Sequence, residues 1–144
     1  MKYLILAVFL LLPLGLFADM LKENAPIQQF VIKDQFEKSM NITSQTKQII
    51  IAFTKAEGEG IKTFLETHPN YLVENDALYF MDATSVPSLV MSIFMMPKFK
   101  KYSYSIGLLE NEKDVAYFPK KEDRITVITL DNLTVTAITF KEKL

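Results

Sequence analysis

The stretch QIIIAFTKAEGEG, residues 48–60, decides the fold that this sequence predicts. Residues 49–53 are apolar at consecutive positions and rich in isoleucine, which is typical of a short strand buried on both faces of a parallel sheet. Residues 55–60 combine acidic side chains with two glycines, and we expect them to form a loop. The following segment, IKTFLETH, repeats apolar side chains at helical spacing from Ile61 and stops before Pro69. The sequence therefore predicts a buried central strand, an acidic loop and a helix.

Further apolar runs on both sides of this stretch predict the remaining elements. In chain order we expect an edge strand within residues 30–36, a strand at 77–81 and a helix from Pro87 to Pro97. After this helix we expect a strand at about 102–109, a strand extension at 115–118 and a hairpin over 125–140. The hairpin is predicted because two threonine-rich runs, ITVITL and LTVTAITF, flank the turn-forming pair Asp131-Asn132. Strands that alternate with helices and end in an antiparallel hairpin indicate an α/β fold with a mixed sheet.

Residues 1–18 have the pattern of a targeting segment. Lys2 provides a positive end, residues 4–17 form an apolar run, and Ala18 offers a small residue at a cleavage site. The run is shorter than the roughly 20 apolar residues of a membrane-spanning helix. We therefore expect a signal peptide over 1–18, a single periplasmic domain over 19–144, and cleavage near Ala18; retention of the segment as an anchor stays open.

The composition excludes several classes of function. The sequence has 16 Lys and Arg residues against 17 Asp and Glu residues. Nucleic-acid binding needs a clear basic excess, so we expect no nucleic-acid partner. The sequence has no cysteine and one histidine, His68, so it has neither disulfide bonds nor the several His and Cys ligands of a zinc site. We expect no cofactor and no metal in the leading interpretation.

The segment FVIKDQFEK, residues 30–38, resembles the F-x-L-x-D-Q-x-G-K opening of peroxiredoxin-type members of the thioredoxin-like superfamily. Residues 49–54, IIIAFT, stand where that group has its first long central strand. The similarity extends over residues 27–109. It implies a thioredoxin-like mixed sheet flanked by helices, with the C-terminal hairpin in place of the family's final helix.

The same resemblance shows what this sequence lacks. The family carries a reactive cysteine, or a Cys-x-x-Cys pair, at the N-terminus of the helix after the central strand, where the helix dipole stabilises a thiolate. The corresponding residues 55–60 contain no sulfur. Thiol–disulfide exchange and thiol peroxidation are therefore excluded for this sequence. The family also has a cis-proline before a later strand, and the sequence leaves open whether Pro87 or Pro97 takes that role.

Our leading hypothesis is a binding or accessory module of the cell envelope that uses three segments, 55–60, 82–87 and 96–102. The methionine-rich helix end and the cations and aromatics of PKFKKY are typical of contact surfaces. The partner we expect is another envelope protein, with contact to the membrane surface and the oligomeric state left open. The candidate binding residues are Glu57, Glu59, Asp82, Thr84, Ser85, Pro87, Pro97, Phe99, Lys100 and Lys101.

Two other classes of function stay open at this point. The first is an enzyme that uses the carboxylates Glu57, Glu59 and Asp82, with or without a divalent cation, because ligands of open α/β sheets bind at the carboxyl ends of the strands. The second is a structural subunit of an envelope assembly. Each carboxylate also has an ordinary structural explanation, since acids favour a helix N-terminus and Asp, Ser and Thr cap helices.

Overall fold

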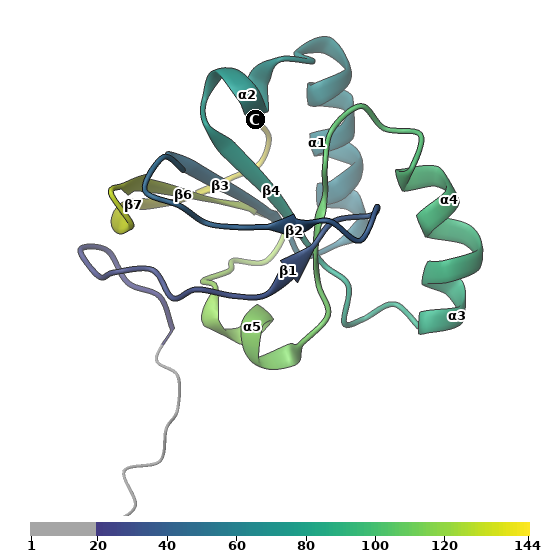
Figure 1. The fold of residues 1–144 in the computed structure, drawn as a ribbon, viewed down its shortest axis with the longest axis horizontal. Coiled ribbons are helices and arrows are strands. Elements are labelled where there is room, and N and C mark those ends of the chain that lie inside the picture. Colours follow the sequence, from purple (N-terminus) through teal and green to yellow (C-terminus); the bar gives the residue numbers. More distant parts are fainter. Residues whose placement is uncertain (1–19) are drawn as a thin grey trace, which may run out of the picture.

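The computed structural model describes residues 20–144, so the predicted signal peptide lies outside the described residues. These residues form a seven-stranded sheet in the order β2-β1-β5-β4-β3-β6-β7 (Figure 1). The strands are β1 (Ile32–Lys33), β2 (Ser39–Met40), β3 (Gln48–Ala52), β4 (Ala77–Asp82), β5 (Gly107–Leu109), β6 (Ile125–Asp131) and β7 (Thr134–Lys141). The helices are α1 (Lys55–Thr67), α2 (Tyr71–Glu74), α3 (Ser88–Val90), the π-helical η1 (Met91–Met95), α4 (Met96–Phe99) and α5 (Glu112–Tyr117).

The predicted central strand is confirmed as β3. It pairs in parallel with β4 and antiparallel with β6, so it lies inside the sheet. Its side chains alternate between two cores: Ile49 and Ile51 belong to one, Ile50 and Ala52 to the other, and all four are fully buried. A strand covered on both faces has no polar side, which explains its continuous apolar sequence.

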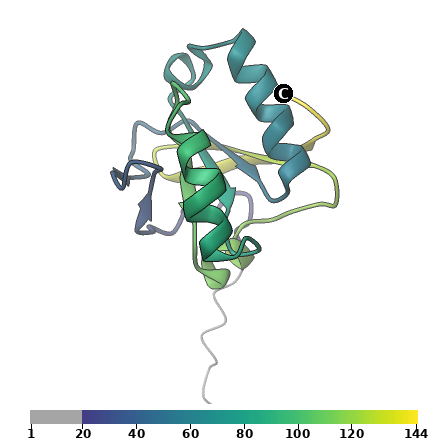
Figure 2. The same cartoon turned by 90° about the vertical axis from the view of Figure 1, so that its right-hand side faces the viewer.

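Helices cover the two faces of the sheet separately. On one face, α1 contributes Ile61 and Leu65 to the core that contains Ile50. On the other face, α5 and the residues just after it contribute Val115 and Phe118 to the core that contains Ile49. Figure 2 shows α1 and α5 on opposite sides of the sheet, with the helix of residues 88–99 standing beside it. The strands and this layering confirm the predicted mixed α/β sheet and its C-terminal hairpin.

Three of the predicted elements differ in the structure. The expected loop at 55–60 is wrong, because α1 begins at Lys55 and includes both glycines. The expected strand at 115–118 is wrong, because these residues belong to or follow α5, whose N-cap Asn111 accepts a hydrogen bond from the backbone N–H of Lys113. The third strand is β5 alone, shorter than expected, because residues 100–106 form turns after α4.

The helix of residues 88–99 passes through Pro97 instead of ending there. Proline lacks an N–H, and its ring clashes with the carbonyl group four residues earlier. The turns before Pro97 are widened to π-helix over Met91–Met95, and the backbone N–H of Met96 bonds to the carbonyl oxygen of Met91. Such π-helical turns accommodate an interruption of the regular pattern. Peptide bonds within residues 20–144 are all trans, including those before Pro87 and Pro97.

The C-terminal hairpin is confirmed, with its turn one residue later than predicted. Asp131 pairs with Thr134, so the two turn residues are Asn132 and Leu133, with φ of 46° and 66°. Positive φ at both positions is the geometry of a type I′ turn, which matches the twist of the flanking strands. A register shift between Thr129 and Leu130 displaces the pairing at this end of the hairpin.

No helix within residues 20–144 is both long and apolar enough to cross a bilayer.

Candidate functional site

The N-terminus of α1 is closed by its own side chains. The Oγ1 atom of Thr54 accepts a hydrogen bond from the backbone N–H of Glu57 at 3.2 Å, and the Glu57 carboxylate accepts one from the backbone N–H of Phe53 at 3.1 Å and one from the Thr54 hydroxyl group. This reciprocal arrangement is a capping box. Glu57 as a whole residue is 8% exposed. The first turn of α1 is therefore closed by an internal anion, whose charge suits a helix N-terminus.

A cavity of about 450 Å³ lies between α1 and the helix of residues 88–99, over the side of β4 that faces α1. We name it the tyrosine cleft. Its lining residues are Thr54, Lys55, Gly58, Glu59 and Lys62 on the α1 side, Ser85, Val86, Pro87, Val90, Phe94, Met95, Lys98 and Phe99 on the other side, and Tyr79, Met81, Tyr102, Tyr104 and Ile106 from β4 and the segment before β5. Its volume is in the range of small-molecule sites, which is about 300–1,000 Å³.

Three tyrosines run through this cleft as a connected group. The ring centroids of Tyr79 and Tyr104 are 6.1 Å apart, and those of the stacked pair Tyr104 and Tyr102 are 5.2 Å apart. The Nζ atom of Lys62 lies 5.8 Å from the Tyr102 ring centroid. Aromatic rings at these separations attract each other and the cation. The group therefore links a buried tyrosine to a lysine at the cleft's rim.

Tyr79 is the most deeply placed polar residue of the cleft. It is 2% exposed as a whole residue. No hydrogen bond from its hydroxyl group is found within residues 20–144, and since no fully buried side-chain oxygen or nitrogen there lacks a partner, the hydroxyl oxygen retains access to the cleft. A Cβ atom built on Gly58 of α1 would lie 3.6 Å from the hydroxyl oxygen, which places that oxygen against a side-chain-free part of the helix. Burial raises the pKa of Tyr79, and to a lesser degree that of Tyr104. Both hydroxyl groups thus stay protonated and able to donate at neutral pH.

The charged residues of the cleft are mostly basic. Lys55, Lys62 and Lys98 line it, against one acid, Glu59. The Nζ atom of Lys98 donates to the Glu59 carboxylate at 3.0 Å across the cleft. This hydrogen bond is the main reason that the pKa of Glu59 is lowered and that of Lys98 is raised. The pair stays ionised. Lys62 lies 3.6 Å from the Glu66 carboxylate outside the lining, so Lys55 is the lining lysine that forms no salt bridge within residues 20–144.

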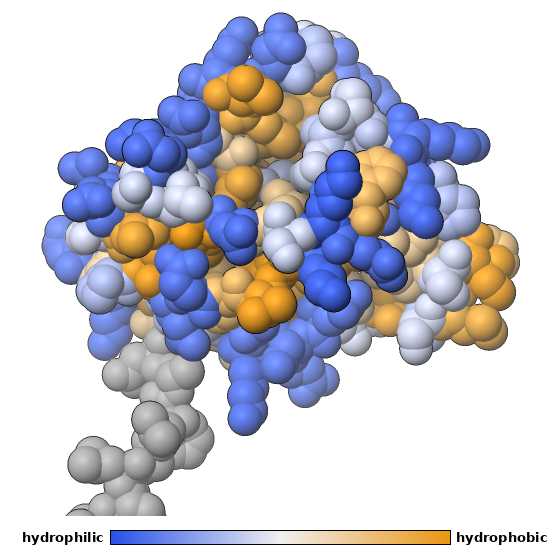
Figure 3. Space-filling view, viewed as in Figure 1, coloured by the Kyte–Doolittle hydropathy of each residue, from blue (hydrophilic) through white to orange (hydrophobic). Residues whose placement is uncertain are grey.

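The wall that faces α1 across the cleft is apolar and continues onto an exposed surface. Val90 and Phe94 line the cleft, and Phe94 is 71% exposed. Leu89 and Ile93 on the same helix are also largely exposed. Figure 3 shows this apolar surface at the right edge of the molecule, over α3. Exposed large apolar side chains that gather beside a cavity indicate a contact surface. We refer to Leu89, Val90, Ile93 and Phe94 as the apolar ridge.

The structure brings the three predicted segments together, although not every predicted residue lies in the cleft. Glu59, Ser85, Pro87 and Phe99 line it, and Phe99 is 5% exposed, so its ring belongs to the wall and the core. The remaining candidates lie elsewhere: Glu57 in the capping box, Asp82 and Thr84 hydrogen-bonded to each other at 2.6 Å, and Pro97, Lys100 and Lys101 exposed outside the lining.

Sequence reasoning missed the residues that give the cleft its character. Tyr79, Tyr102 and Tyr104 lay in expected strands, where aromatic side chains are ordinary. Lys62 and Phe94 lay on expected helices. The one available signal was the local concentration of Tyr with Lys in the segment 98–104, KFKKYSY. Nothing in the sequence places residues 98–104 beside α1, because β4 and most of the helix of residues 88–99 lie between the two segments along the chain.

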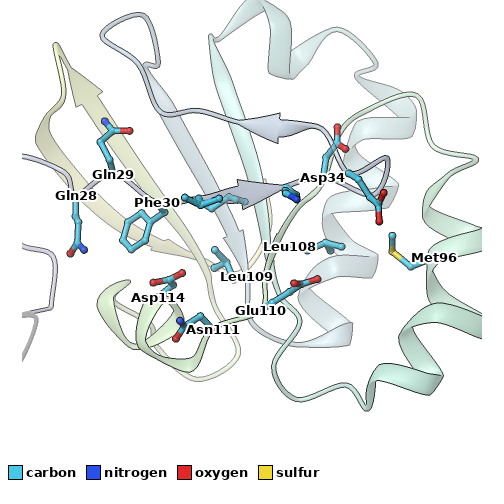
Figure 4. Close-up of a pocket in the computed structure, with 14 residues that line it drawn as sticks. Gln28, Gln29, Phe30, Asp34, Met96, Leu108, Leu109, Glu110, Asn111 and Asp114 are labelled. Carbon is cyan, nitrogen blue, oxygen red and sulfur yellow. The ribbon is translucent and has the colours of Figure 1, made fainter.

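A second hollow, of about 690 Å³, lies between residues 28–34, β5 and α5 (Figure 4). The Phe30 ring and the Asp114 carboxyl group lie at one end, and Asp34 and Met96 at the other. Asp34 is committed to its own turn, since its Oδ1 atom accepts from the backbone N–H groups of Phe36 at 2.8 Å and Lys38 at 3.0 Å. Burial raises the pKa of Asp114.

Within residues 20–144 no three His, Cys, Asp or Glu side chains are grouped as a metal site requires.

Comparisons with known proteins define the fold of the chain. No protein-family model matches the sequence, and no curated protein matches it. Solved structures do. A peroxidoxin from Mycobacterium tuberculosis superposes with a TM-score of 0.56 at 14% identity, covering 84% of this chain and 86% of that chain. The thioredoxin domain of a thiol-disulfide oxidoreductase from Bacteroides vulgatus gives a TM-score of 0.55 at 13% identity, covering 84% and 90%.

A peroxiredoxin-like protein from Aquifex aeolicus adds a TM-score of 0.54 at 11% identity, covering 86% of this chain and 78% of that chain. Identities this low show the fold alone. The neighbours agree with the resemblance found at residues 30–38 and 49–54, and this sequence contains no cysteine at any position. The chain is therefore a thioredoxin-like protein in fold, one that lacks the redox cysteines.

Proposed function

We propose that this protein is an exported, non-redox binding module of the cell envelope, and that the tyrosine cleft is its binding site. One observation carries the proposal. The segments 55–60, 82–87 and 96–102, far apart in sequence, each contribute lining residues to one cavity of about 450 Å³. A cavity with apolar walls and a few convergent polar groups is the form that binding sites usually take.

The side chains around the cleft favour binding over catalysis. The Glu57 carboxylate is held by the capping box, and Glu59 is paired with Lys98. Asp82 accepts from the backbone N–H and the hydroxyl group of Thr84. His68 is exposed at the far end of α1, where its Nδ1 atom lies 2.9 Å from the Thr67 hydroxyl oxygen. These carboxylates are thus held in a helix cap, a turn and an ion pair, and the contact between Thr67 and His68 lies outside the lining of the cleft.

The proposals of export and of an envelope partner rest on the sequence pattern of residues 1–18 and on the apolar ridge. We propose that the mature domain begins near Asp19 in the periplasm and that its cleft and ridge meet a component of the envelope. An envelope protein and the membrane surface both suit an exposed apolar ridge. Mass spectrometry of the protein from a periplasmic fraction tests export, because a chain that still carries residues 1–18 would contradict cleavage.

Site-specific photocrosslinking tests the binding site without assuming what binds. A benzoylphenylalanine replaces Phe94 in the cleft wall, or Val73 on α2 as a matched control, since both side chains are highly exposed and apolar. The proposal predicts a discrete adduct, lipid or protein, from position 94 in intact cells and none from position 73. Equal adducts from the two positions, or none from either, would contradict a binding site at the cleft.

A further inference from the structure

We propose that the tyrosine cleft binds a single-chain anionic amphiphile, of the chemical class of a long-chain carboxylate. The inference rests on the proposed function, because it names the ligand class of the same site. Three features carry it: two unlike walls, a group of apolar side chains on one of them, and a polar side that carries lysines and reaches the hydroxyl group of Tyr79, which has no hydrogen-bond partner within residues 20–144.

The two walls differ in chemistry along the whole cleft. The α1 side presents Lys55, Glu59 and Lys62, which are charged. The opposite side presents mainly apolar side chains, among them Val90, Phe94 and Met95, with Ser85 and Lys98 as its polar side chains. A ligand that fills this space must be apolar along one side or one end and polar at another. A uniformly polar ligand would place polar groups against the apolar wall, where they have no hydrogen-bond partners. A pure hydrocarbon would cover the charged lysine side chains without offering them a partner.

The apolar wall favours an acyl chain over a peptide. Each residue of a bound peptide brings a backbone N–H and a C=O that need partners once they are buried. The wall offers the side chains of Val86, Val90, Phe94 and Phe99, which carry no hydrogen-bonding atoms. From Ser88 to Phe99 its backbone is helical, and the N–H groups of Met91 and Met96 are bonded within the helix. A hydrocarbon chain needs no partners and gains by burial about 0.8 kcal/mol per CH₂ group.

The polar side of the cleft selects an anionic end. Three lysines line the cleft against one glutamate, and the segment between Asp82 and Glu110 contains lysines but no acidic residue. The Tyr79 hydroxyl group, which reaches the cleft and has no hydrogen-bond partner within residues 20–144, can donate a hydrogen bond to an oxygen there. A carboxylate accepts from hydroxyl and ammonium donors alike, and charge-assisted hydrogen bonds are the stronger kind.

Calorimetric titration of the purified mature domain with dodecanoate, below its micelle-forming concentration, tests this inference. Dodecylammonium is the matched cationic probe with the same chain. We expect saturable binding of dodecanoate and at least roughly tenfold weaker binding of dodecylammonium, which corresponds to about 1.4 kcal/mol. Tyr79→Phe removes one hydroxyl group and should weaken dodecanoate binding about threefold to tenfold. Phe94→Ser should weaken both probes, because it removes wall that contacts the chain.

Val73→Ser and Lys113→Gln are the controls, since both residues are exposed and lie outside the cleft; each should leave dodecanoate binding unchanged. Circular dichroism of every variant establishes that it is folded. Equal affinity for the two probes would overturn the proposal of an anionic amphiphile. Dodecanoate binding that is unchanged by both Tyr79→Phe and Phe94→Ser would overturn it as well. Photocrosslinked protein from position 94 together with no dodecanoate binding would overturn this inference and leave the proposed function standing. The absence of both signals would overturn both.

Discussion

Replacing Glu57 by alanine should destabilise the fold more than replacing any exposed acid of the same helix. The Glu57 carboxylate accepts from the backbone N–H of Phe53 and from the Thr54 hydroxyl group, and its own N–H is bonded to Thr54. Loss of a helix cap costs about 1 kcal/mol, and loss of a hydrogen bond to a charged group costs about 1.5–3 kcal/mol. Alanine's higher helix propensity returns a few tenths of a kcal/mol. We therefore expect a net loss of about 2–3.5 kcal/mol.

Urea denaturation followed by far-ultraviolet circular dichroism measures this loss, since the sequence has no tryptophan to report by fluorescence. Glu66→Ala is the matched control on α1. Its carboxylate forms an exposed pair with Lys62 at 3.6 Å, four residues earlier, and such pairs contribute about 0.3–0.5 kcal/mol. Glu57→Gln keeps a capping-box side chain and should lose about 1 kcal/mol. The reasoning fails if Glu57→Ala and Glu66→Ala lower the free energy of unfolding by the same amount.

Three further outcomes are expected. Gly107→Ala should lower the free energy of unfolding by about 1–3 kcal/mol, because its Cβ atom would lie 2.5 Å from a carbon of the fully buried Phe80 ring. Gly60→Ala, whose Cβ atom would have no atom within 4 Å, should raise the free energy of unfolding by about 0.5–1 kcal/mol. Urea titrations measure both changes. Stability should fall above about pH 10, the unfolded pKa of tyrosine, because the folded pKa of Tyr79 is raised, and Tyr79→Phe should flatten that fall in denaturation curves taken at increasing pH. Glu59→Gln removes the one acid that lines the cleft, so it should tighten dodecanoate binding several-fold in calorimetry, and an unchanged affinity would contradict the role given to charge.

The sequence predicted the sheet better than the helix ends. The strands β3 and β4 were identifiable because strands buried on both faces have no polar side. The start of α1 was missed because Gly58 and Gly60 disfavour a helix by about 1 kcal/mol each. The signal that would have found it is the capping-box spacing of Thr54 and Glu57, and in the structure that cap outweighs the glycines.

The meeting of the three segments at the proposed binding site was anticipated from the sequence, but most of the residues that line the cleft were not. Its three segments follow from topology, because the ends of parallel strands and the helices after them converge at one edge of a sheet. The connection from Tyr79 through Tyr104 to Tyr102 depends on how residues 100–106 fold back after α4. That path is set by the irregular helix around Pro97 and by Gln35, whose side chain bonds to the carbonyl oxygens of Phe99 and Tyr104 and to the N–H of Ile106. Contacts across such sequence distances are not visible in local patterns.

A thiol site combines the stabilisation of an anion and the binding of a substrate at one helix end. In this protein the capping box holds an internal anion, and the cleft is the separate site that we propose for the ligand. A reactive thiolate needs a helix N-terminus left free to stabilise it, and here the Glu57 carboxylate occupies that terminus from within. An external anion at the end of α1 would therefore meet a negative charge, whereas the lining of the cleft supplies lysines. It follows that changes at Glu57 should alter stability while leaving the preference for dodecanoate over dodecylammonium intact, and changes at Tyr79 should do the reverse at neutral pH. If Glu57→Gln removed that preference, the anion would be binding at the end of α1 and the cleft would not be its site.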